Sequence, residues 1–130
     1  MAGIRRDLQQ TMERGVGVYR TEESLKEAVE EVRALRGRYE DLALDDRDRA
    51  YNTELVAALE LENMLEVAET VVGAALQRRE SRGSHTRRDY ADRDDEGFLT
   101  HSLAFASGDG PRIDYDDVTI TRWPPAERKY

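Results

Sequence analysis

The sequence predicts a mainly α-helical fold: an antiparallel three-helix bundle followed by a C-terminal arm of irregular and β structure. Two observations predict it. Apolar residues recur at helical spacing in three segments before residue 80, and alternating apolar residues, typical of strands, return only after residue 100. A stretch dense in charged residues lies between these parts. We therefore expect residues 4–80 to form the bundle, and residues 81–130 to form a charged loop and a C-terminal arm with a β-hairpin.

The first two predicted helices are short and amphipathic. The first is indicated by apolar side chains that recur every four residues, Ile4, Leu8 and Met12, and it ends at the Gly15–Gly17 segment. The second begins at Thr21, a favourable N-cap, and has Glu22 and Glu23 in its first turn, where the helix dipole stabilises anions. Its apolar stripe consists of Leu25, Ala28, Val29, Val32 and Leu35. Gly37 is expected to loosen or end this helix.

The third helix is the longest predicted element. It runs from about residue 52 or 53 to about residue 79, after a charged connector over residues 38–50. Its apolar positions are Leu55, Val56, Leu59, Leu61, Met64, Leu65, Val67, Ala68, Val71, Val72, Ala75 and Leu76. This arc is wider than the roughly 100° that one neighbour requires, and a helix of this length spans about 40 Å. We therefore expect the third helix to pack against both preceding helices.

Beyond the helices the sequence changes character. Residues 78–96 contain six Arg and six Asp or Glu. Strand patterns follow in three alternating pairs: Leu103 with Phe105, Ile113 with Tyr115, and Val118 with Ile120. Residues 107–111, Ser-Gly-Asp-Gly-Pro, predict a turn between the first two pairs. The odd step between the last two pairs predicts a bulge or bend near Asp116–Asp117, and Pro124–Pro125 ends any strand pairing.

The composition excludes several classes of function. The chain has 130 residues, no Cys and a net charge of −8. Without thiols it forms no disulfide, zinc–thiolate or iron–sulfur site, and the negative charge argues against binding to nucleic acid or anionic lipid. No apolar run approaches the roughly 20 residues of a membrane-spanning helix, and the N-terminus lacks a signal-peptide pattern. We therefore expect a soluble, cytoplasmic protein without direct membrane insertion.

The charged segment contains the candidate functional residues. Of the 20 basic residues of the chain, 18 are Arg, and Arg pairs with carboxylates through two parallel hydrogen bonds. Equal numbers of Arg and acidic residues therefore favour a docking surface, and a disordered charged linker is the alternative. The candidate interface residues are Arg82, His85, Arg87, Asp89, Tyr90, Arg93, Asp94 and Asp95.

Other chemistries at this segment have weaker support. A metal site could use His85 together with Asp89, Asp92 or Asp94 as ligands, but the interleaved Arg side chains compete for these carboxylates. His85 beside a carboxylate also has the composition of a general acid–base pair. A nucleic-acid surface is disfavoured because the acidic residues cancel the Arg charge. The sequence contains neither a Gly-rich phosphate loop nor a Gly-x-Ser-x-Gly elbow, so we assign no catalytic, cofactor-binding or metal-binding residue.

Several ordered motifs resemble one protein family. They are Asn52–Val56, Leu59–Leu65, Glu80–Gly83, His85, Asp89–Tyr90, Arg93–Glu96, Gln9–Met12, Val18–Arg20, His101–Leu103 and the ending Pro124–Tyr130. In order and separation they are similar to motifs of the C-terminal helical domain of the succinate dehydrogenase and fumarate reductase flavoprotein subunit. The Pro-Pro to Arg to Tyr ending favours the succinate dehydrogenase branch over L-aspartate oxidase, which shares the Glu-Ser-Arg-Gly motif.

The resemblance implies a fold similar to the spectrin-repeat-like helical domain of that family. It also implies a parent enzyme that binds FAD covalently, oxidises succinate to fumarate and passes electrons to an iron–sulfur subunit. The flavin, substrate and proton-transfer residues of the family lie upstream of this domain, so we expect no cofactor and no catalytic residue in this chain. The implied partners are the flavin-binding domain of the same polypeptide and the iron–sulfur subunit, in a membrane-anchored complex at the cytoplasmic, inner face of the membrane. The alternatives are a fumarate reductase or L-aspartate oxidase domain, or a free-standing adaptor bundle.

Overall fold

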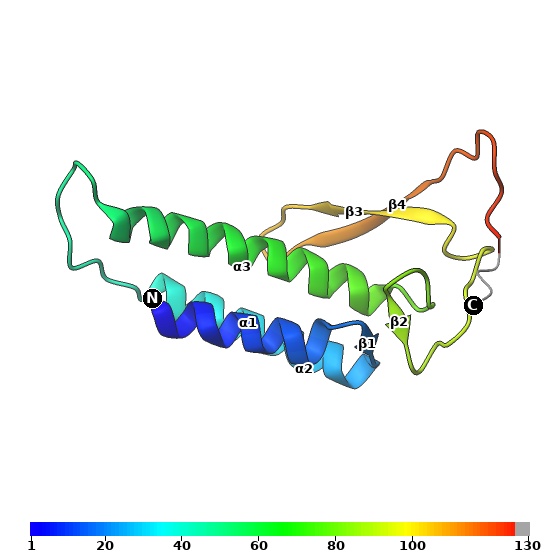
Figure 1. Cartoon of the computed structure of the whole chain (residues 1–130), viewed down its shortest axis with the longest axis horizontal. Coiled ribbons are helices and arrows are strands. Elements are labelled where there is room, and N and C mark those ends of the chain that lie inside the picture. Colours follow the sequence, from blue (N-terminus) through cyan, green and yellow to red (C-terminus); the bar gives the residue numbers. More distant parts are fainter. Residues whose placement is uncertain (127–130) are drawn as a thin grey trace.

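Three long helices form the body of the molecule (Figure 1). They are α1 (Ala2–Val16), α2 (Glu22–Glu40) and α3 (Thr53–Gln77). The computed structural model describes residues 1–126. Successive helices run in opposite directions, as Figure 1 shows, and α2 packs against both α1 and α3. The predicted antiparallel three-helix bundle is therefore confirmed.

The core consists of apolar side chains that the three helices turn toward one another. Its buried members are Ile4, Leu8 and Val16 of α1; Leu25, Ala28, Val32 and Leu35 of α2; and Leu61, Leu65, Ala68, Val72 and Ala75 of α3. Most of them belong to the stripes that the spacing predicts. The helices α1 and α2 approach so closely that a methyl group at Gly15 would lie 2.9 Å from the Cβ atom of Ala28. Glycine at this position therefore allows the close contact between the two helices.

Side-chain caps define the beginnings of α2 and α3. Thr21 is the N-cap of α2, as predicted: its hydroxyl accepts a hydrogen bond from the Ser24 N–H, and the Ser24 hydroxyl accepts one from the Thr21 N–H, both at 3.1 Å. Asn52 caps α3 by accepting a 2.7 Å hydrogen bond from the Leu55 N–H. Each cap satisfies an N–H group that has no partner inside the helix.

Two helix ends differ from the prediction. Gly37 does not end α2, which runs through it to Glu40. The flanking residues Leu35 and Tyr39 pack on the core, and their burial outweighs the roughly 1 kcal/mol that Gly costs inside a helix. The helix α3 ends at Gln77, two residues before the predicted end, because Arg78 already has an extended backbone.

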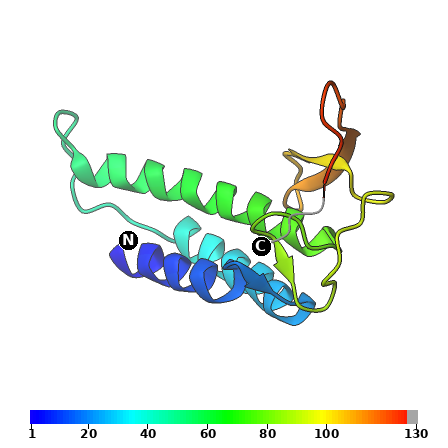
Figure 2. The ribbon, with the colours of Figure 1, turned by 45° about the vertical axis from the view of Figure 1, so that its right-hand side comes forward.

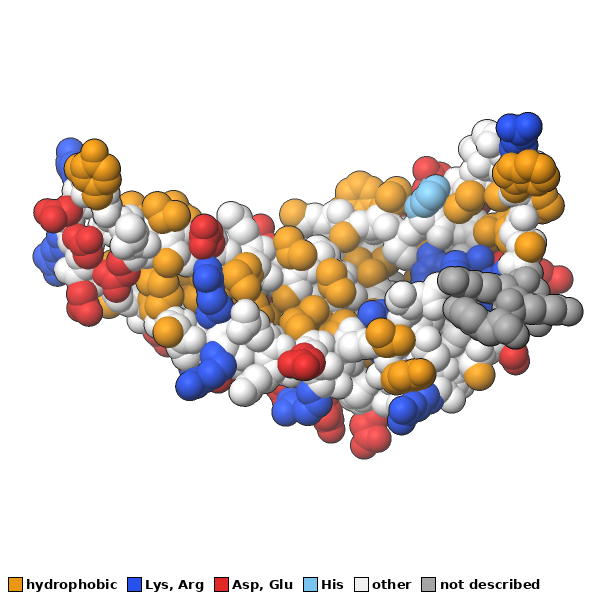
Figure 3. Space-filling view, viewed as in Figure 1, with side chains coloured by type: hydrophobic (Ala, Val, Ile, Leu, Met, Phe, Trp, Pro, Cys, Tyr) orange, Lys and Arg blue, Asp and Glu red, His pale blue; other side chains and the backbone are white. Residues whose placement is uncertain are grey.

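The long helix α3 buries only part of its apolar arc. It contacts α2 more extensively than α1. Several of its apolar side chains remain between 42% and 61% exposed: Leu55, Val56, Leu59, Val67 and Val71. Figure 3 shows apolar side chains spread over the face that α1 and α3 form together. The predicted contact with both neighbours is present, but the arc is wider than these two contacts cover.

The predicted β-hairpin is confirmed. It consists of the antiparallel strands β3 (Thr100–Phe105) and β4 (Arg112–Asp117), with Thr100 opposite Asp117 and Phe105 opposite Arg112. The hairpin lies beside α3 (Figure 1), and Gly110 in its turn has a φ of +97°, which Gly adopts without steric cost.

The end of the hairpin differs from the prediction. Val118 and Ile120 lie beyond β4, which ends at Asp117. Of the bulge or bend predicted near this position, the bulge is wrong, because the register is continuous up to Asp117 and the strand ends there. Pro124–Pro125 therefore follows a strand that has already ended.

A second, smaller sheet was not predicted. Its two strands are parallel and two residues long: β1 (Tyr19–Arg20) and β2 (Thr86–Arg87). The N–H groups of Thr86 and Arg88 donate hydrogen bonds of 3.1 and 2.9 Å to the carbonyls of Val18 and Arg20. This pairing attaches the charged segment to the loop between α1 and α2. None of the helices within residues 1–126 is long and apolar enough to cross a membrane.

Candidate functional site

The charged segment, residues 78–96, lies at the end of the bundle where α3 finishes and α2 begins (Figure 2). It opens with a tight turn in which Arg82 and His85 exchange backbone hydrogen bonds of 2.8 and 3.0 Å. Gly83 occupies this turn with a φ of +59°, a left-handed conformation that favours Gly. The Ser81 hydroxyl holds the turn against the next residues, because it accepts a 2.9 Å hydrogen bond from the Arg87 N–H.

Glu80 is the centre of a first group of ion pairs. Its side chain is fully buried. Its carboxylate accepts hydrogen bonds from Arg78 (2.6 Å), from Arg82 through two nitrogens (2.8 and 3.0 Å), and from the Asp94 N–H (2.9 Å). Burial raises the pKa of Glu80, but the hydrogen bonds outweigh burial and hold the pKa below its usual value. Glu80 is therefore a carboxylate neutralised by two guanidinium groups.

The same group of ion pairs extends to the surface through Asp95. One carboxylate oxygen of Asp95 accepts a hydrogen bond from Arg82, and the other accepts one from Arg93, both at 2.7 Å. The hydrogen bond from Arg82 is the main cause of a lowered pKa at Asp95. Arg93 also donates to the carbonyl of Ala126 at 2.8 Å. The side chains of Arg93 and Asp95 are 31% and 37% exposed, so this end of the group faces solvent.

Arg78 joins the group to the hairpin. Beyond Glu80, its guanidinium donates to the carbonyls of Phe98 (2.8 Å) and Thr100 (2.6 Å) and to the Ser102 hydroxyl (3.1 Å). It also lies over the Phe98 ring, 5.5 Å from the centroid. One partly buried cation therefore connects the end of α3, the charged segment and β3.

Arg87 forms a second group at the C-terminal end of α3. Its side chain is fully buried. One of its guanidinium nitrogens donates to three carbonyls at the helix end: Ala75 (3.3 Å), Leu76 (3.2 Å) and Arg78 (3.2 Å). The last carbonyls of a helix have no partner inside the helix and carry the negative end of its dipole. The Arg87 side chain therefore acts as a charged C-terminal cap for α3.

Asp89 connects this cap to α2. It accepts two hydrogen bonds from Arg87, at 2.8 and 2.7 Å, and a third from the Glu22 N–H at 2.8 Å in the first turn of α2. The hydrogen bonds from Arg87 lower the pKa of Asp89 far below its usual range, and Asp89 in turn raises the pKa of Arg87. The Tyr90 ring lies 4.9 Å from the Arg87 guanidinium. The pair thus places a cation at the end of α3 and an anion at the start of α2, as both helix dipoles favour.

His85 lies between the two groups. Its Nδ1 atom is 2.7 Å from Arg20 Nη1, and its Nε2 atom is 3.0 Å from the Arg78 carbonyl. Because a guanidinium can only donate, Nδ1 is the acceptor and Nε2 carries the proton. Burial lowers the pKa of His85, and although the hydrogen bond to the carbonyl opposes this, the cations of Arg20, Arg87 and Arg78 lower it further. His85 is therefore a neutral link between the β1 loop and the end of α3.

This environment predicts a pH dependence of stability. The pKa of His85 is lower in the folded chain than its ordinary 6.5, so below about pH 6.5 the unfolded chain binds a proton that the folded chain does not. The free energy of unfolding is then expected to fall as the pH falls from 7 to 5, by up to about 1.4 kcal/mol per pH unit. We expect His85→Gln to flatten this slope in urea unfolding, whereas His101→Gln, at an exposed position in β3, keeps it. Equal slopes in both variants would contradict the assignment.

The structure brings the predicted residues together in two groups. The contacts around Glu80 include Arg82, Arg93, Asp94 and Asp95. The cap of α3 is formed by Arg87, Asp89 and Tyr90. His85 lies between the two groups. Sequence reasoning did not single out Glu80, Arg78 or Arg20 as site residues. The position of a residue in a charged stretch does not show whether its side chain is buried. The one signal that could have pointed to Glu80 was the Glu-Ser-Arg-Gly motif that contains it.

The buried charges of this arrangement are paired within the chain. Glu80 and Arg87 are buried and paired, and both ring nitrogens of His85 have hydrogen-bond partners. A general base needs a free lone pair in reach of a substrate, and His85 offers none. Within residues 1–126, no three His, Asp or Glu side chains come together as ligands for a metal ion.

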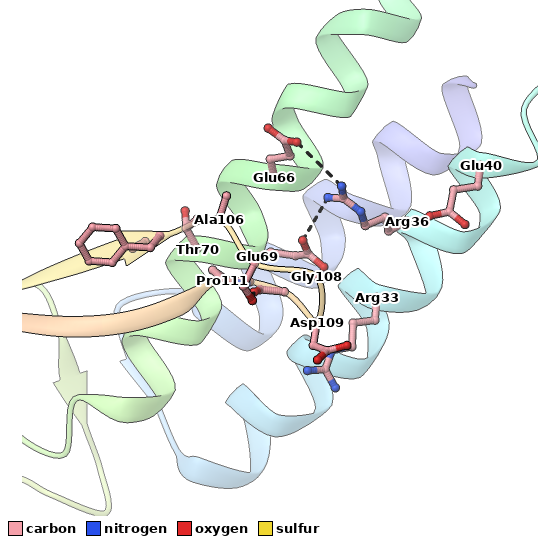
Figure 4. A pocket seen from close by; sticks show the side chains of 14 residues that line it. Arg33, Arg36, Glu40, Glu66, Glu69, Thr70, Ala106, Gly108, Asp109 and Pro111 are labelled. Carbon is pink, nitrogen blue, oxygen red and sulfur yellow. Dashed lines mark hydrogen bonds and ion pairs between the residues drawn. The ribbon is translucent and has the colours of Figure 1, made fainter.

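A pocket of about 390 Å³ lies elsewhere, between α2, α3 and the hairpin turn (Figure 4). Arg36 forms ion pairs there with Glu69 at 3.1 Å and Glu66 at 3.8 Å. Arg33 and Asp109 lie at its edge near the hairpin turn. None of the eight candidate interface residues lines this pocket. It is therefore separate from the charged network.

Comparison with known proteins identifies relatives of the chain. Residues 5–130 match the family model described as fumarate reductase flavoprotein C-term. The chain is 50% identical to the fumarate reductase flavoprotein subunit of Mycobacterium tuberculosis over 131 residues, and 38% identical to the succinate dehydrogenase flavoprotein subunit of Rickettsia bellii over 138 residues. These alignments cover 100% of this chain but only 22% and 23% of the two relatives. The chain thus spans about a fifth of their length.

Solved structures agree with this result. The chain matches Escherichia coli quinol fumarate reductase with a TM-score of 0.92 and 40% identity, covering 97% of this chain and 22% of that one. It matches Mycobacterium smegmatis Sdh1 in complex with UQ1 with a TM-score of 0.83 and 32% identity, covering 92% of this chain and 20% of that one. The chain therefore belongs to the family of C-terminal domains of succinate dehydrogenase and fumarate reductase flavoprotein subunits, as its motifs indicate.

Proposed function

We propose that this chain is the non-catalytic C-terminal domain of a flavoprotein subunit that interconverts succinate and fumarate, and that it acts in domain and subunit packing. The observation that carries the proposal is the pairing of charge at the end of the bundle. Glu80 and Arg87 are fully buried, and their hydrogen bonds go to other groups of the same chain. Such a domain supplies shape and complementary surface, whereas reacting groups must be free to contact a substrate.

The proposal assigns the redox chemistry to the parts of the subunit outside this chain. The relatives are named as flavoprotein subunits, and this chain aligns with about a fifth of their length. In the proposal, FAD and the dicarboxylate bind in the remaining part, and electrons pass between the flavin and an iron–sulfur subunit. The proposal also puts the complex at the cytoplasmic face of a membrane. Its membrane association is supported by a solved relative, a quinol–fumarate reductase with menaquinol molecules, because such quinols are soluble in lipid.

Two candidates remain for the direction of the reaction. The ending Pro124–Tyr130 favours the succinate dehydrogenase branch over L-aspartate oxidase, and residues 127–130 of it lie outside the described residues. The identities favour fumarate reductase, at 50% against 38% for the two relatives compared. We propose succinate dehydrogenase, with fumarate reductase as the second candidate.

The direction of the reaction is tested in the full-length subunit with its partners. A larger kcat/KM for succinate with a quinone analogue than for fumarate with a quinol analogue supports succinate dehydrogenase, and the reverse supports fumarate reductase. Turnover of L-aspartate in place of both would contradict the proposal.

We further propose that the charged segment contacts the flavin-binding domain or the iron–sulfur subunit. Within the chain, Arg82, Arg87 and Asp89 hold the segment in place, so their pairing presents a preformed surface. Arg93 and Asp95 lie at its solvent-facing edge. A preformed charged surface loses little side-chain entropy when a partner binds, which favours tight and oriented docking.

Reversing the charge of Arg93 is expected to weaken assembly of the full-length enzyme. With Arg93→Glu, the affinity for the partner should fall about tenfold, equivalent to roughly 1.4 kcal/mol. Co-purification with the iron–sulfur subunit and succinate-dependent electron transfer measure the loss. Arg47→Glu is the matched control, because Arg47 is exposed in the connector at the opposite end of the bundle. If Arg93→Glu assembles and transfers electrons as well as Arg47→Glu, this part of the proposal is wrong.

A further inference from the structure

An apolar groove of about 470 Å³ lies between α1 and α3. Leu8 and Met12 line it from α1, and Met64, Val67 and Val71 line it from α3. Val67 and Val71 are 61% and 42% exposed. None of the residues that line the groove is charged. Removing apolar surface from water is favourable by about 25 cal/mol per Å². A partner that covers this groove and the apolar side chains beside it would therefore bind favourably.

The groove runs along α3, beside an ion pair that joins the two helices. The ion pair between Arg5 of α1 and Glu60 of α3, at 3.0 Å, bridges the two helices next to it. From Asn63 to Val71 the groove follows α3 for about 12 Å, at 1.5 Å per residue. Past the ion pair, Val56 and Leu59 remain 55% and 51% exposed and extend the apolar surface of α3. The apolar surface therefore continues along α3 beyond the groove.

The chemistry of the groove restricts what can fill it. The helices on both sides have satisfied their own backbone groups, and the only polar side chains in the lining are the amides of Gln9 and Asn63. An extended peptide would bury N–H and C=O groups here without partners, which costs free energy for each group. A helix satisfies its backbone internally, and a third helix laid against two others completes a bundle by side-chain packing.

We propose that the α1–α3 groove is the seat of an amphipathic helix contributed by the part of the flavoprotein subunit that lies outside this chain. The inference rests on the proposed function, which makes this chain one domain of a larger polypeptide. It is supported by the length of the relatives, of which this chain spans 22% and 23%. The helix turns an uncharged, apolar stripe toward Met12, Met64 and Val67.

Thiol accessibility tests whether the groove is covered. The chain has no Cys, so Val67→Cys reports on the groove, and Ala34→Cys is the matched control at an exposed position of α2. Alkylation is followed by mass spectrometry of the peptide that carries each new thiol. In the 130-residue chain, we expect both to react at similar rates. In the full-length subunit within its complex, Val67→Cys is expected to react at least about tenfold more slowly, while Ala34→Cys is unchanged.

A photo-crosslinking residue at position 64 identifies the occupant. The expected product joins Met64→benzoylphenylalanine to a peptide of the same polypeptide, outside this domain, with apolar residues every three to four positions. Crosslinking to a second copy of this chain or to the iron–sulfur subunit overturns the proposal. So does a Val67→Cys thiol that reacts in the complex as fast as the control. Because turnover of succinate or fumarate is measured separately, these results leave the proposed function standing, whereas absence of that turnover removes it.

Discussion

Replacing Glu80 with Ala is expected to lower the free energy of unfolding of the chain by about 3 kcal/mol, the usual scale for removing one partner of a buried ion pair. Glu80 is fully buried and accepts hydrogen bonds from Arg78, Arg82 and the Asp94 N–H. Without its carboxylate, two guanidiniums lie together with 13% and 28% of their side chains exposed. Water can compensate them only in part, so most of the cost remains. Urea unfolding followed by circular dichroism measures the change.

Two further variants make this prediction specific. Glu80→Gln retains an acceptor of similar shape but no charge. Its free energy of unfolding is therefore expected to lie between that of the native chain and that of Glu80→Ala. Glu96→Ala removes an exposed carboxylate of the same segment and is expected to change stability by less than about 0.5 kcal/mol. An unfolding midpoint for Glu80→Ala that coincides with that of Glu96→Ala would show that the buried network contributes nothing.

The bundle could be predicted because the patterns that produce its helices are local and periodic in the sequence. The stripe through Leu25, Val32 and Leu35 reports burial directly, and the Thr21 cap is a two-residue pattern. The hairpin was predictable for the same reason, from alternation and a turn that contains Gly110. The small β1–β2 sheet was not, since strands of two residues have no period and their pairing joins positions 19 and 86. Pairing between such distant positions depends on the tertiary structure.

The residue types of the site could be predicted, but the burial of each side chain could not. The charge count correctly located the Arg-rich segment, and the pairing habit of Arg correctly favoured ion pairs. It did not distinguish Arg87, which is fully buried, from Arg88 beside it, which is exposed. That difference arises because the chain passes across the end of α3, where only one of the two neighbours can reach the helix carbonyls. Docking of the segment onto a partner remains a prediction.

The contacts of Arg87 suggest a role beyond charge balance. Its guanidinium caps three carbonyls at the end of α3 and pairs with Asp89, which in turn accepts a hydrogen bond from the Glu22 N–H of α2. Two helices that are adjacent in the bundle are thus linked at their ends by one rigid, forked side chain. Lys has one compact ammonium group in place of the fork. It therefore cannot reach the carbonyls and both Asp89 oxygens together.

Replacing Arg87 with Met is accordingly expected to destabilise the chain by about 3 kcal/mol, because it leaves helix carbonyls and Asp89 without their partner. Arg87→Lys should recover only part of this loss. The link itself is measured by a double-mutant cycle: because Arg87→Met removes the partner of Asp89, adding Asp89→Asn to it should cost less than Asp89→Asn costs alone, with a coupling of about 2 kcal/mol. Hydrogen exchange should also increase in the last turn of α3 and the first turn of α2, while the end of α2 near Glu40 stays protected. Additive effects, with unchanged exchange at both helix ends, would mean that Arg87 fills space without linking the helices.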